Sequence, residues 1–285
     1  MNFLEISNNE TSLLIINCQS AGELISMSGV FCDLSNRYNN IFIINDHLSI
    51  YSNLNIKGYS TEDIISSTYN NKFIFNINEY ADLLNQQSSI SSICNYTFNN
   101  KLEYVKPIIN LSEEELLYAQ NFKNKLDNNK KILIIHPFAS GCLSGNYDPS
   151  KKSFRDYFTR DLISRYKDTY NILQVHNKNQ HYFSDTISLA DKELREIFSI
   201  ISIADKIISC DTMTQHAAAA LNIKALVLWS VTNEKIYGHP LHKNFREFEL
   251  FNNKIDIRNK NIYIPTTINM FTEKTFTIIE DYLNE

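Results

Sequence analysis

Residues suited to binding an anion lie where a strand is expected to pass into a helix. The apolar run from Lys206 to Cys210 predicts a buried strand, and Asp211 and Thr212 after it are favoured residues at the start of a helix. The first N–H groups of a helix have no partner inside it, and the helix dipole adds partial positive charge there. The junction therefore predicts a site for a phosphate or a pyrophosphate.

The helix expected after this junction carries His216 one turn from its start. Residues 217–220 are four alanines, whose small side chains allow close packing on a sheet. Asn222 suits a left-handed residue that ends the helix. His216 has two interpretations: it contacts the pyrophosphate or sugar of a ligand, or it is a core histidine with satisfied hydrogen bonds.

Lys152 and Glu23 carry charges that suit two further roles. Lys152 would neutralise a departing diphosphate as a point charge; alternatively it is a solvated lysine beside Lys151. Glu23 would take the proton of an attacking hydroxyl group; alternatively it is a surface carboxylate in the first turn of a helix. Ser140 and Thr232 are loop hydroxyls at strand ends and are candidates for phosphate or nucleoside contacts.

A metal site is the other chemistry that residue types suggest. His136, His176 and His181 are candidate ligands, but their spacing matches no recognised pattern. The five cysteines are scattered and include no C-x-x-C pair. We therefore predict no metal site and no disulfide framework.

The elements that must position these residues alternate between strands and helices in two blocks. In the first block, apolar runs at residues 11–17 and 41–45 flank a helical repeat at 24–38, which forms a βαβ unit. Residues 72–78 and 89–95 predict two further short strands.

A polar connection separates this block from a second alternation. Ser112 and Glu115 predict a capping box at the start of a helix that ends near residue 126. Strands are then expected at residues 131–136, 171–175, 206–210 and 224–229, with helices between them.

This order predicts an α/β fold with two doubly wound domains. We expect an N-terminal domain over residues 1–127, a C-terminal domain over 128–270 and a C-terminal helix within 271–285. Ligands of such sheets bind beyond the carboxyl ends of the strands, so the cleft between the domains is the expected site.

Composition excludes several other classes of protein. The chain has 285 residues with a net charge of −5, which argues against non-specific nucleic-acid binding through a basic face. No apolar stretch approaches the roughly 20 residues of a membrane span, and the N-terminus has no signal-peptide pattern. We expect a cytoplasmic protein, with peripheral association at the inner face of the membrane left open.

Four segments resemble glycosyltransferase family nine, the bacterial lipopolysaccharide heptosyltransferases of the GT-B fold. Residues 211–216 (DTMTQH) and the alanines after them resemble the family's Asp-Ser-Gly-x-x-His helix, with Met213 in place of glycine. Residues 134–140 (IIHPFAS) resemble its His-Pro-Gly-Ala loop, and residues 152–155 (KSFR) its Lys-x-Trp-Pro segment. Residues 20–25 (SAGELI) resemble its Gly-Asp turn, with Glu23 as the carboxylate.

The resemblance implies two Rossmann-like domains facing a cleft, with an abbreviated N-terminal domain. It implies an inverting, metal-independent transfer of a sugar, heptose or a related one, from a nucleotide-diphosphate donor to a hydroxyl acceptor, without a cofactor. ADP-heptose is the donor that the family suggests, and the acceptor is a lipopolysaccharide, another surface glycan or a protein side chain. Glu23 would be the catalytic base. The donor phosphate and sugar would be bound by Ser140, Lys152, Asp211, Thr212, Met213, His216 and Thr232.

Two other functions are compatible with the same residues. One is a nucleotide-sugar epimerase or hydrolase on this architecture, which would turn over without an acceptor. The other is a non-catalytic protein that binds a nucleotide sugar or a protein partner, since fold alone does not imply activity.

Overall fold

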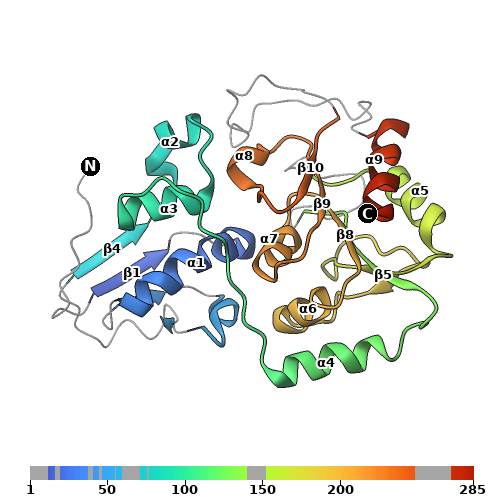
Figure 1. The fold of residues 1–285 in the computed structure, drawn as a ribbon, viewed down its shortest axis with the longest axis horizontal. Coiled ribbons are helices and arrows are strands. Elements are labelled where there is room, and N and C mark those ends of the chain that lie inside the picture. The colour runs from blue at the N-terminus through green and yellow to red at the C-terminus, as the bar shows by residue number, and fades with distance from the viewer. Residues whose placement is uncertain are drawn as a thin grey trace.

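The computed structural model describes residues 12–16, 20–37, 41–44, 47–54, 56–59, 71–75, 77–139, 152–247 and 271–285. Within these residues the chain forms two parallel sheets, each flanked by helices, which lie side by side (Figure 1). This arrangement confirms the predicted α/β class with two doubly wound units.

The N-terminal sheet has four described strands in the order β3-β2-β1-β4. They are β1 (Ser12–Ile16), β2 (Ile41–Ile44), β3 (Lys57–Tyr59) and β4 (Asn71–Phe75). Its helices are α1 (Ala21–Arg37), α2 (Ala81–Asn85) and α3 (Ile90–Asn99), with 3-10 turns at Leu48–Tyr51 and Ile77–Tyr80.

The C-terminal sheet has six described strands in the order β10-β9-β8-β5-β6-β7. They are β5 (Lys131–His136), β6 (Tyr170–Gln174), β7 (Ile187–Ser188), β8 (Lys206–Ser209), β9 (Leu226–Leu228) and β10 (Lys243–Phe245). The strand order reverses direction between β5 and β8, and in open parallel sheets ligands bind beside such a switch point.

Helices cover both faces of this second sheet. They are α5 (Asp156–Tyr166), α6 (Leu194–Ile201), α7 (Met213–Ala220), α8 (Glu234–Tyr237) and α9 (Glu273–Asn284). Before the sheet begins, α4 (Glu113–Lys123) packs against α6 at one end of the molecule (Figure 1). None of the described helices is long and apolar enough to cross a membrane.

Local sequence signals explain several of these boundaries. The Ser112 hydroxyl accepts a hydrogen bond from the Glu115 N–H, and the Glu115 carboxylate accepts one from the Ser112 N–H, which confirms the predicted capping box. Asn222 ends α7 with φ of 63°, as expected of a left-handed residue. One prediction was wrong: residues 89–95 form the start of α3 rather than a strand. The Ser89 hydroxyl caps that helix by accepting from the Ser92 N–H.

The two faces of the six-stranded sheet bury separate hydrophobic clusters because successive side chains of a strand point to opposite faces. On β5, Ile132 and Ile134 join one cluster, whereas Leu133 and Ile135 join the other. The first cluster extends through α6 and α7 into the N-terminal half, so the two halves share one continuous core.

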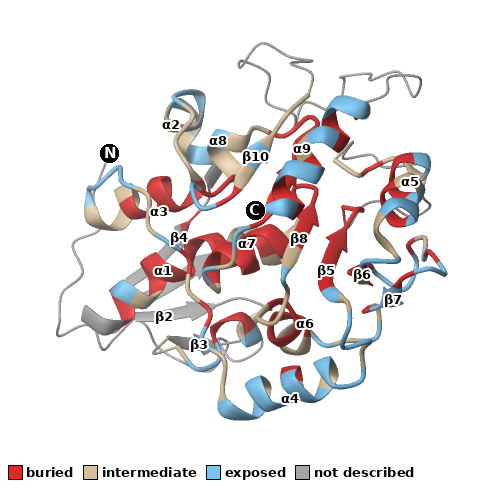
Figure 2. Ribbon diagram, turned by 45° about the vertical axis from the view of Figure 1, so that its right-hand side comes forward, coloured by how far each residue is buried: buried red, intermediate tan, exposed pale blue. Residues whose placement is uncertain are grey.

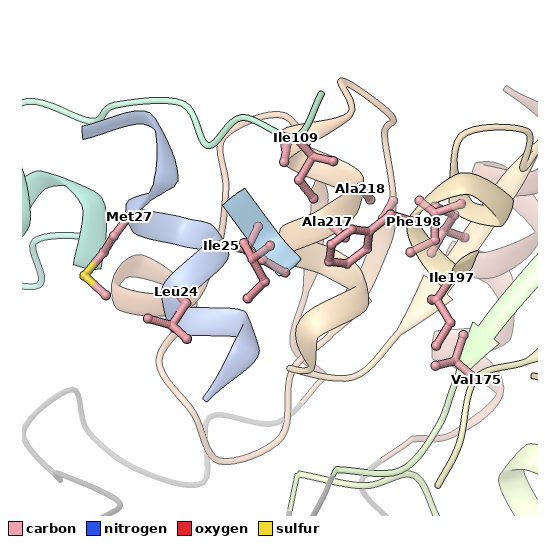
Figure 3. Packing of buried hydrophobic residues seen from close by; sticks show 14 of the residues in the cluster. Leu24, Ile25, Met27, Ile109, Val175, Ile197, Phe198, Ala217 and Ala218 are labelled. Carbon is pink, nitrogen blue, oxygen red and sulfur yellow. The ribbon is translucent and has the colours of Figure 1, made fainter. Parts of the chain in front are cut away.

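Helix α1 is the main contact of the N-terminal half with the C-terminal half, and it packs along α7 (Figures 1 and 2). Leu24 and Ile25 of α1 belong to the same cluster as Ala217 and Ala218 of α7 (Figure 3). The alanines predicted to allow close packing on a sheet therefore also allow close packing between two helices.

Candidate functional site

A cavity of about 490 Å³ lies between the two halves, beyond the carboxyl ends of β5, β6 and β8. The N-terminal half contributes lining residues from the start of α1 and from the turn after β2. The lining residues include Ser20, Ala21, Gly22, Glu23, His47, His136, Lys152, His176, Asn177, Lys192, Asp211, Thr212, Met213, His216 and Tyr237. Its place beside the switch point of the sheet is the one expected for a ligand site.

An ion pair between a partly buried lysine and a buried aspartate forms part of the cavity wall. Lys152 Nζ lies 2.9 Å from Asp211 Oδ2, and the Asp211 side chain is 4% exposed. Burial opposes the charged form of Lys152, but the neighbouring Asp211 carboxylate outweighs it and raises the pKa of the ammonium group above its usual value. Lys152 therefore stays positively charged at neutral pH and supplies a fixed cation at the cavity.

The residues after Lys152 fix its place. The Ala139 N–H donates to the Ser153 hydroxyl at 2.8 Å, and the Phe154 N–H donates to the Pro137 carbonyl at 2.7 Å. The Phe154 ring is buried in the hydrophobic cluster on the far face of the sheet. The chain is thus anchored two residues from the cation.

The start of α7 reaches the cavity without a side-chain cap. Thr212 occupies the N-cap position in extended conformation, but its hydroxyl makes no capping hydrogen bond. The Thr212 hydroxyl instead contacts His136 Nδ1 at 3.0 Å and the Ser209 hydroxyl at 2.9 Å. Asp211, the other expected cap, pairs with Lys152. The first N–H groups of α7 thus lack the side-chain acceptor that usually satisfies them, which suits an anionic ligand.

The start of α1 borders the same cavity from the opposite half, and Glu23 lies in its first turn. Gly22 makes this approach feasible, because a Cβ atom there would lie 2.7 Å from His216 Cδ2 and 3.5 Å from the Met213 Cα. The two helix starts therefore contact each other at the wall of the cavity. A methyl group at position 22 would displace His216.

His216 is buried and tied to both halves. Its Nδ1 lies 2.8 Å from the Ser26 hydroxyl of α1 and 2.8 Å from His239 Nε2. Its Nε2 lies 3.9 Å from Asp211 Oδ1. Burial, with the nearby His242 and Lys152, lowers the pKa of His216 to about 3, so the ring is neutral at physiological pH.

His136 ends β5 and is the second buried histidine at the cavity. Its Nδ1 lies 2.7 Å from the Thr214 hydroxyl and 3.0 Å from the Thr212 hydroxyl. Burial, with a smaller effect of His176, lowers the pKa of His136 to about 3. His136 thus holds the start of α7 against the end of β5 as a neutral ring.

Six of the predicted site residues line this one cavity: Glu23, Lys152, Asp211, Thr212, Met213 and His216. Thr232 is buried but does not border it, and its carbonyl accepts a hydrogen bond from Arg246. Ser140 lies outside the described residues, as does Lys151.

Sequence reasoning missed Tyr237, Lys192, His47 and Asn177 as lining residues, and it missed the contacts of Tyr104 and His239 behind His216. The Tyr237 ring lies 5.6 Å from Lys152 Nζ. No local sequence pattern marked these residues, because their places depend on the packing of the two halves.

Within the part of the chain that the structure describes, no group of three His, Cys, Asp or Glu side chains is arranged to hold a metal ion. Cys32, Cys94 and Cys210 are not in disulfide bonds, and Cys18 and Cys142 lie outside the described residues. His136, His176 and His181, the histidines considered as ligands, each have a hydrogen-bond partner in the protein.

Comparison with known proteins gives a structural likeness only. No family model and no curated protein matches the sequence. The iron-containing dodecameric glycosyltransferase TibC from enterotoxigenic E. coli H10407 is similar, with a TM-score of 0.70 and 10% identity over 96% of this chain and 76% of that chain. A glycosyltransferase of family nine from Veillonella parvula DSM 2008 has a TM-score of 0.65 and 11% identity over 98% and 99% of the two chains.

A third similar structure is the E. coli heptosyltransferase WaaC with ADP-2-deoxy-2-fluoro heptose. Its TM-score is 0.56, with 13% identity over 95% of this chain and 99% of that chain. These likenesses confirm that the chain has the GT-B fold of the family nine heptosyltransferases. At such low sequence identity these likenesses establish the fold but not the reaction.

Proposed function

We propose that the protein is a metal-independent glycosyltransferase that moves a sugar from a nucleoside-diphosphate donor to a hydroxyl acceptor with inversion. The observation that carries the proposal is the meeting of three features at one cavity: Lys152, the uncapped start of α7, and Glu23 from the opposite half. Each suits a different part of a direct displacement, and the GT-B fold supports their assignment.

On the donor side, the diphosphate would lie at the start of α7 beside Lys152. The N–H groups at the start of the helix and the ammonium group would stabilise the charge that develops on the departing phosphate oxygen. Asp211, which pairs with Lys152, would turn its other oxygen toward hydroxyl groups of the sugar. A cation already held by a buried carboxylate needs little reorganisation when the bond to the leaving group breaks.

On the acceptor side, Glu23 would act as general base. The acceptor oxygen attacks the anomeric carbon, the bond from that carbon to the phosphate oxygen breaks, and the acceptor proton passes to the Glu23 carboxylate. Attack on the face opposite the leaving group inverts the anomeric centre. The products are the glycosylated acceptor and a nucleoside diphosphate.

An ADP sugar is the first donor to test, because similar structures were described with ADP, ADP-2-deoxy-2-fluoro heptose and ADP-heptose. Heptose or a related sugar would then be transferred to lipopolysaccharide, another surface glycan or a protein. We place this activity in the cytoplasm, at the inner face of the membrane when the acceptor is carried by a lipid.

The proposal is tested by thermal denaturation with ADP, UDP, GDP and their sugars. A nucleotide at about 100 times its dissociation constant should raise the free energy of unfolding by roughly 2.7 kcal/mol. Lys152→Ala should abolish this stabilisation, because it removes the cation beside the diphosphate. Lys178→Ala is the matched control, since Lys178 is an exposed lysine outside the cavity. Failure of every nucleotide to stabilise the wild type would contradict the proposal and favour a non-catalytic protein.

A further inference from the structure

A line of hydrogen bonds leads from the cavity wall to the segment that joins the two halves. His216 Nδ1 lies 2.8 Å from His239 Nε2, and His239 Nδ1 lies 2.9 Å from the hydroxyl oxygen of Tyr104. Of these three side chains, His216 borders the cavity and the other two lie behind it. Tyr104 belongs to the connection between α3 and α4. The orientation of a cavity residue thus depends on a residue of the other half.

Both histidines of this line are neutral imidazoles. His216 and His239 are each 3% exposed. Burial and the neighbouring His216 and His242 rings lower the pKa of His239 to about 2. A neutral imidazole carries one N–H and one bare nitrogen, so each hydrogen bond in the line has a definite direction.

Gln215 helps to fix that direction. Its side-chain Nε2 lies 3.1 Å from Asp211 Oδ1 and 3.0 Å from the Tyr237 carbonyl, and only the amide nitrogen can donate to two oxygens. The same nitrogen lies 3.4 Å from His216 Nε2. Because the amide nitrogen cannot accept, His216 Nε2 is the bare nitrogen in this arrangement.

Ser26 leads to the same assignment. Its hydroxyl donates to the Gly22 carbonyl at 3.0 Å, so its oxygen is available to accept from His216 Nδ1. With the proton on Nδ1, His216 shares its single N–H between the Ser26 hydroxyl oxygen and His239 Nε2. His239 then carries its own proton on Nδ1 and donates it to Tyr104. In this set of tautomers each contact of the line joins a donor to an acceptor.

We propose that His239 and Tyr104 are positioning residues that hold His216 in the Nδ1–H tautomer, with bare Nε2 facing the cavity as an acceptor for a sugar hydroxyl group. That the hydroxyl group bound by His216 belongs to a sugar rests on the proposed function. Nε2 lies beside Asp211 Oδ1, so the two acceptors present adjacent sites for neighbouring hydroxyl groups of one ring. In the opposite tautomer, Nε2 would instead present an N–H donor there.

The tautomer is measured directly by two-bond ¹H–¹⁵N spectra of protein labelled with ¹⁵N-histidine, without any ligand. We expect His216, assigned with His216→Gln, in the Nδ1–H form in the wild type. His239→Leu replaces the ring with a side chain of similar size that has no acceptor, and it should lower the population of the Nδ1–H form. His239→Gln keeps a carbonyl acceptor and should restore it. An Nε2–H form of His216 in the wild type would overturn the inference.

Two further variants separate positioning from general damage to the fold. Tyr104→Phe removes one hydroxyl group and should shift the His216 tautomer in the same direction as His239→Leu, by less. His242→Asn is the control, since His242 is buried beside His239 but bonds to the Gln215 carbonyl and the Ala225 N–H rather than to His216. An unchanged His216 tautomer in both Tyr104→Phe and His239→Leu would also overturn the inference.

Binding measurements then test what the tautomer is for. His239→Leu should lower the affinity for a nucleotide sugar by about tenfold, which corresponds to the loss of one hydrogen bond of about 1.4 kcal/mol. The affinity for the nucleoside diphosphate without a sugar should equal that of the wild type. Equal weakening of both ligands, or of neither, would contradict the sugar assignment. A wild type that binds no nucleotide contradicts the proposed function alone, because the tautomer is measured without ligand.

Discussion

One face of the six-stranded sheet is covered by α5 and α9 with phenylalanine rings in contact, whereas the other is covered by α6 and α7 with alanines and buried histidines. On the first face the Phe158 ring centroid lies 5.0 Å from that of Phe271 and 5.1 Å from that of Phe276. On the second face, α7 packs against α1 of the N-terminal half.

The two faces differ in what their buried side chains contribute to the protein. Large rings fill the α5 and α9 face and stabilise the fold through apolar burial. The α7 side combines small alanine side chains with buried neutral histidines, whose ring nitrogens can form hydrogen bonds with a ligand. Phe154 connects the two faces, because its buried ring anchors the segment that carries Lys152.

The largest expected effect is on the rate of transfer and concerns the cavity. Glu23→Gln should lower kcat by about 10² to 10⁴-fold, because the amide cannot accept the acceptor proton. The free energy of unfolding should change by less than about 1 kcal/mol, the value of a first-turn charge with the helix dipole. Steady-state kinetics with the donor found by thermal denaturation checks this. A kcat within threefold of the wild type would remove Glu23 as the base.

The next effect is on stability and concerns the aromatic face. Phe276→Ala should lower the free energy of unfolding by about 3–5 kcal/mol, because it removes a buried ring and leaves a cavity. The affinity of the folded protein for nucleotide should stay unchanged, since α9 lies on the face away from the cavity. Urea denaturation and calorimetric titration measure the two quantities. A parallel loss of affinity would show that the two faces are coupled.

The smallest effect is the share of one buried histidine in the pH dependence of stability, and it concerns the α7 side. Burial lowers the pKa values of four histidines to between about 2 and about 4: His136, His216, His239 and His242. In the unfolded chain each binds a proton near pH 6.5, while in the folded protein each stays neutral, so stability falls as the pH drops below about 6.5.

Each of these histidines should cost about 1.4 kcal/mol of stability at pH 5.5 relative to pH 7.5 or above. Urea denaturation at the two pH values measures this loss. His239→Gln should reduce it by one histidine's share, and comparing the two proteins cancels the contribution of the carboxylates. An identical pH dependence of wild type and His239→Gln would contradict the neutral state of His239.

Much of the fold followed from local sequence patterns. Apolar runs such as residues 131–136 and 206–210 have the length and composition of buried parallel strands, and Ser112 with Glu115 specifies a helix start by short-range hydrogen bonds. Residues 89–95 were assigned to the wrong element, because a short apolar run gives the same composition for a strand as for a buried helix.

The sequence by itself determined which residues end strands and begin helices, and therefore that Lys152, Asp211, Thr212 and Glu23 were candidates for one site. These properties depend on neighbours within a few positions along the chain. Only the tertiary structure decided that Thr212 leaves α7 uncapped and that His216 is bound through His239 to Tyr104. The Thr212–His136 contact joins residues 76 positions apart, and the His239–Tyr104 contact joins residues 135 positions apart. The second contact crosses between the halves, which pack closely because Gly22 and the alanines of α7 leave room for two helices to meet.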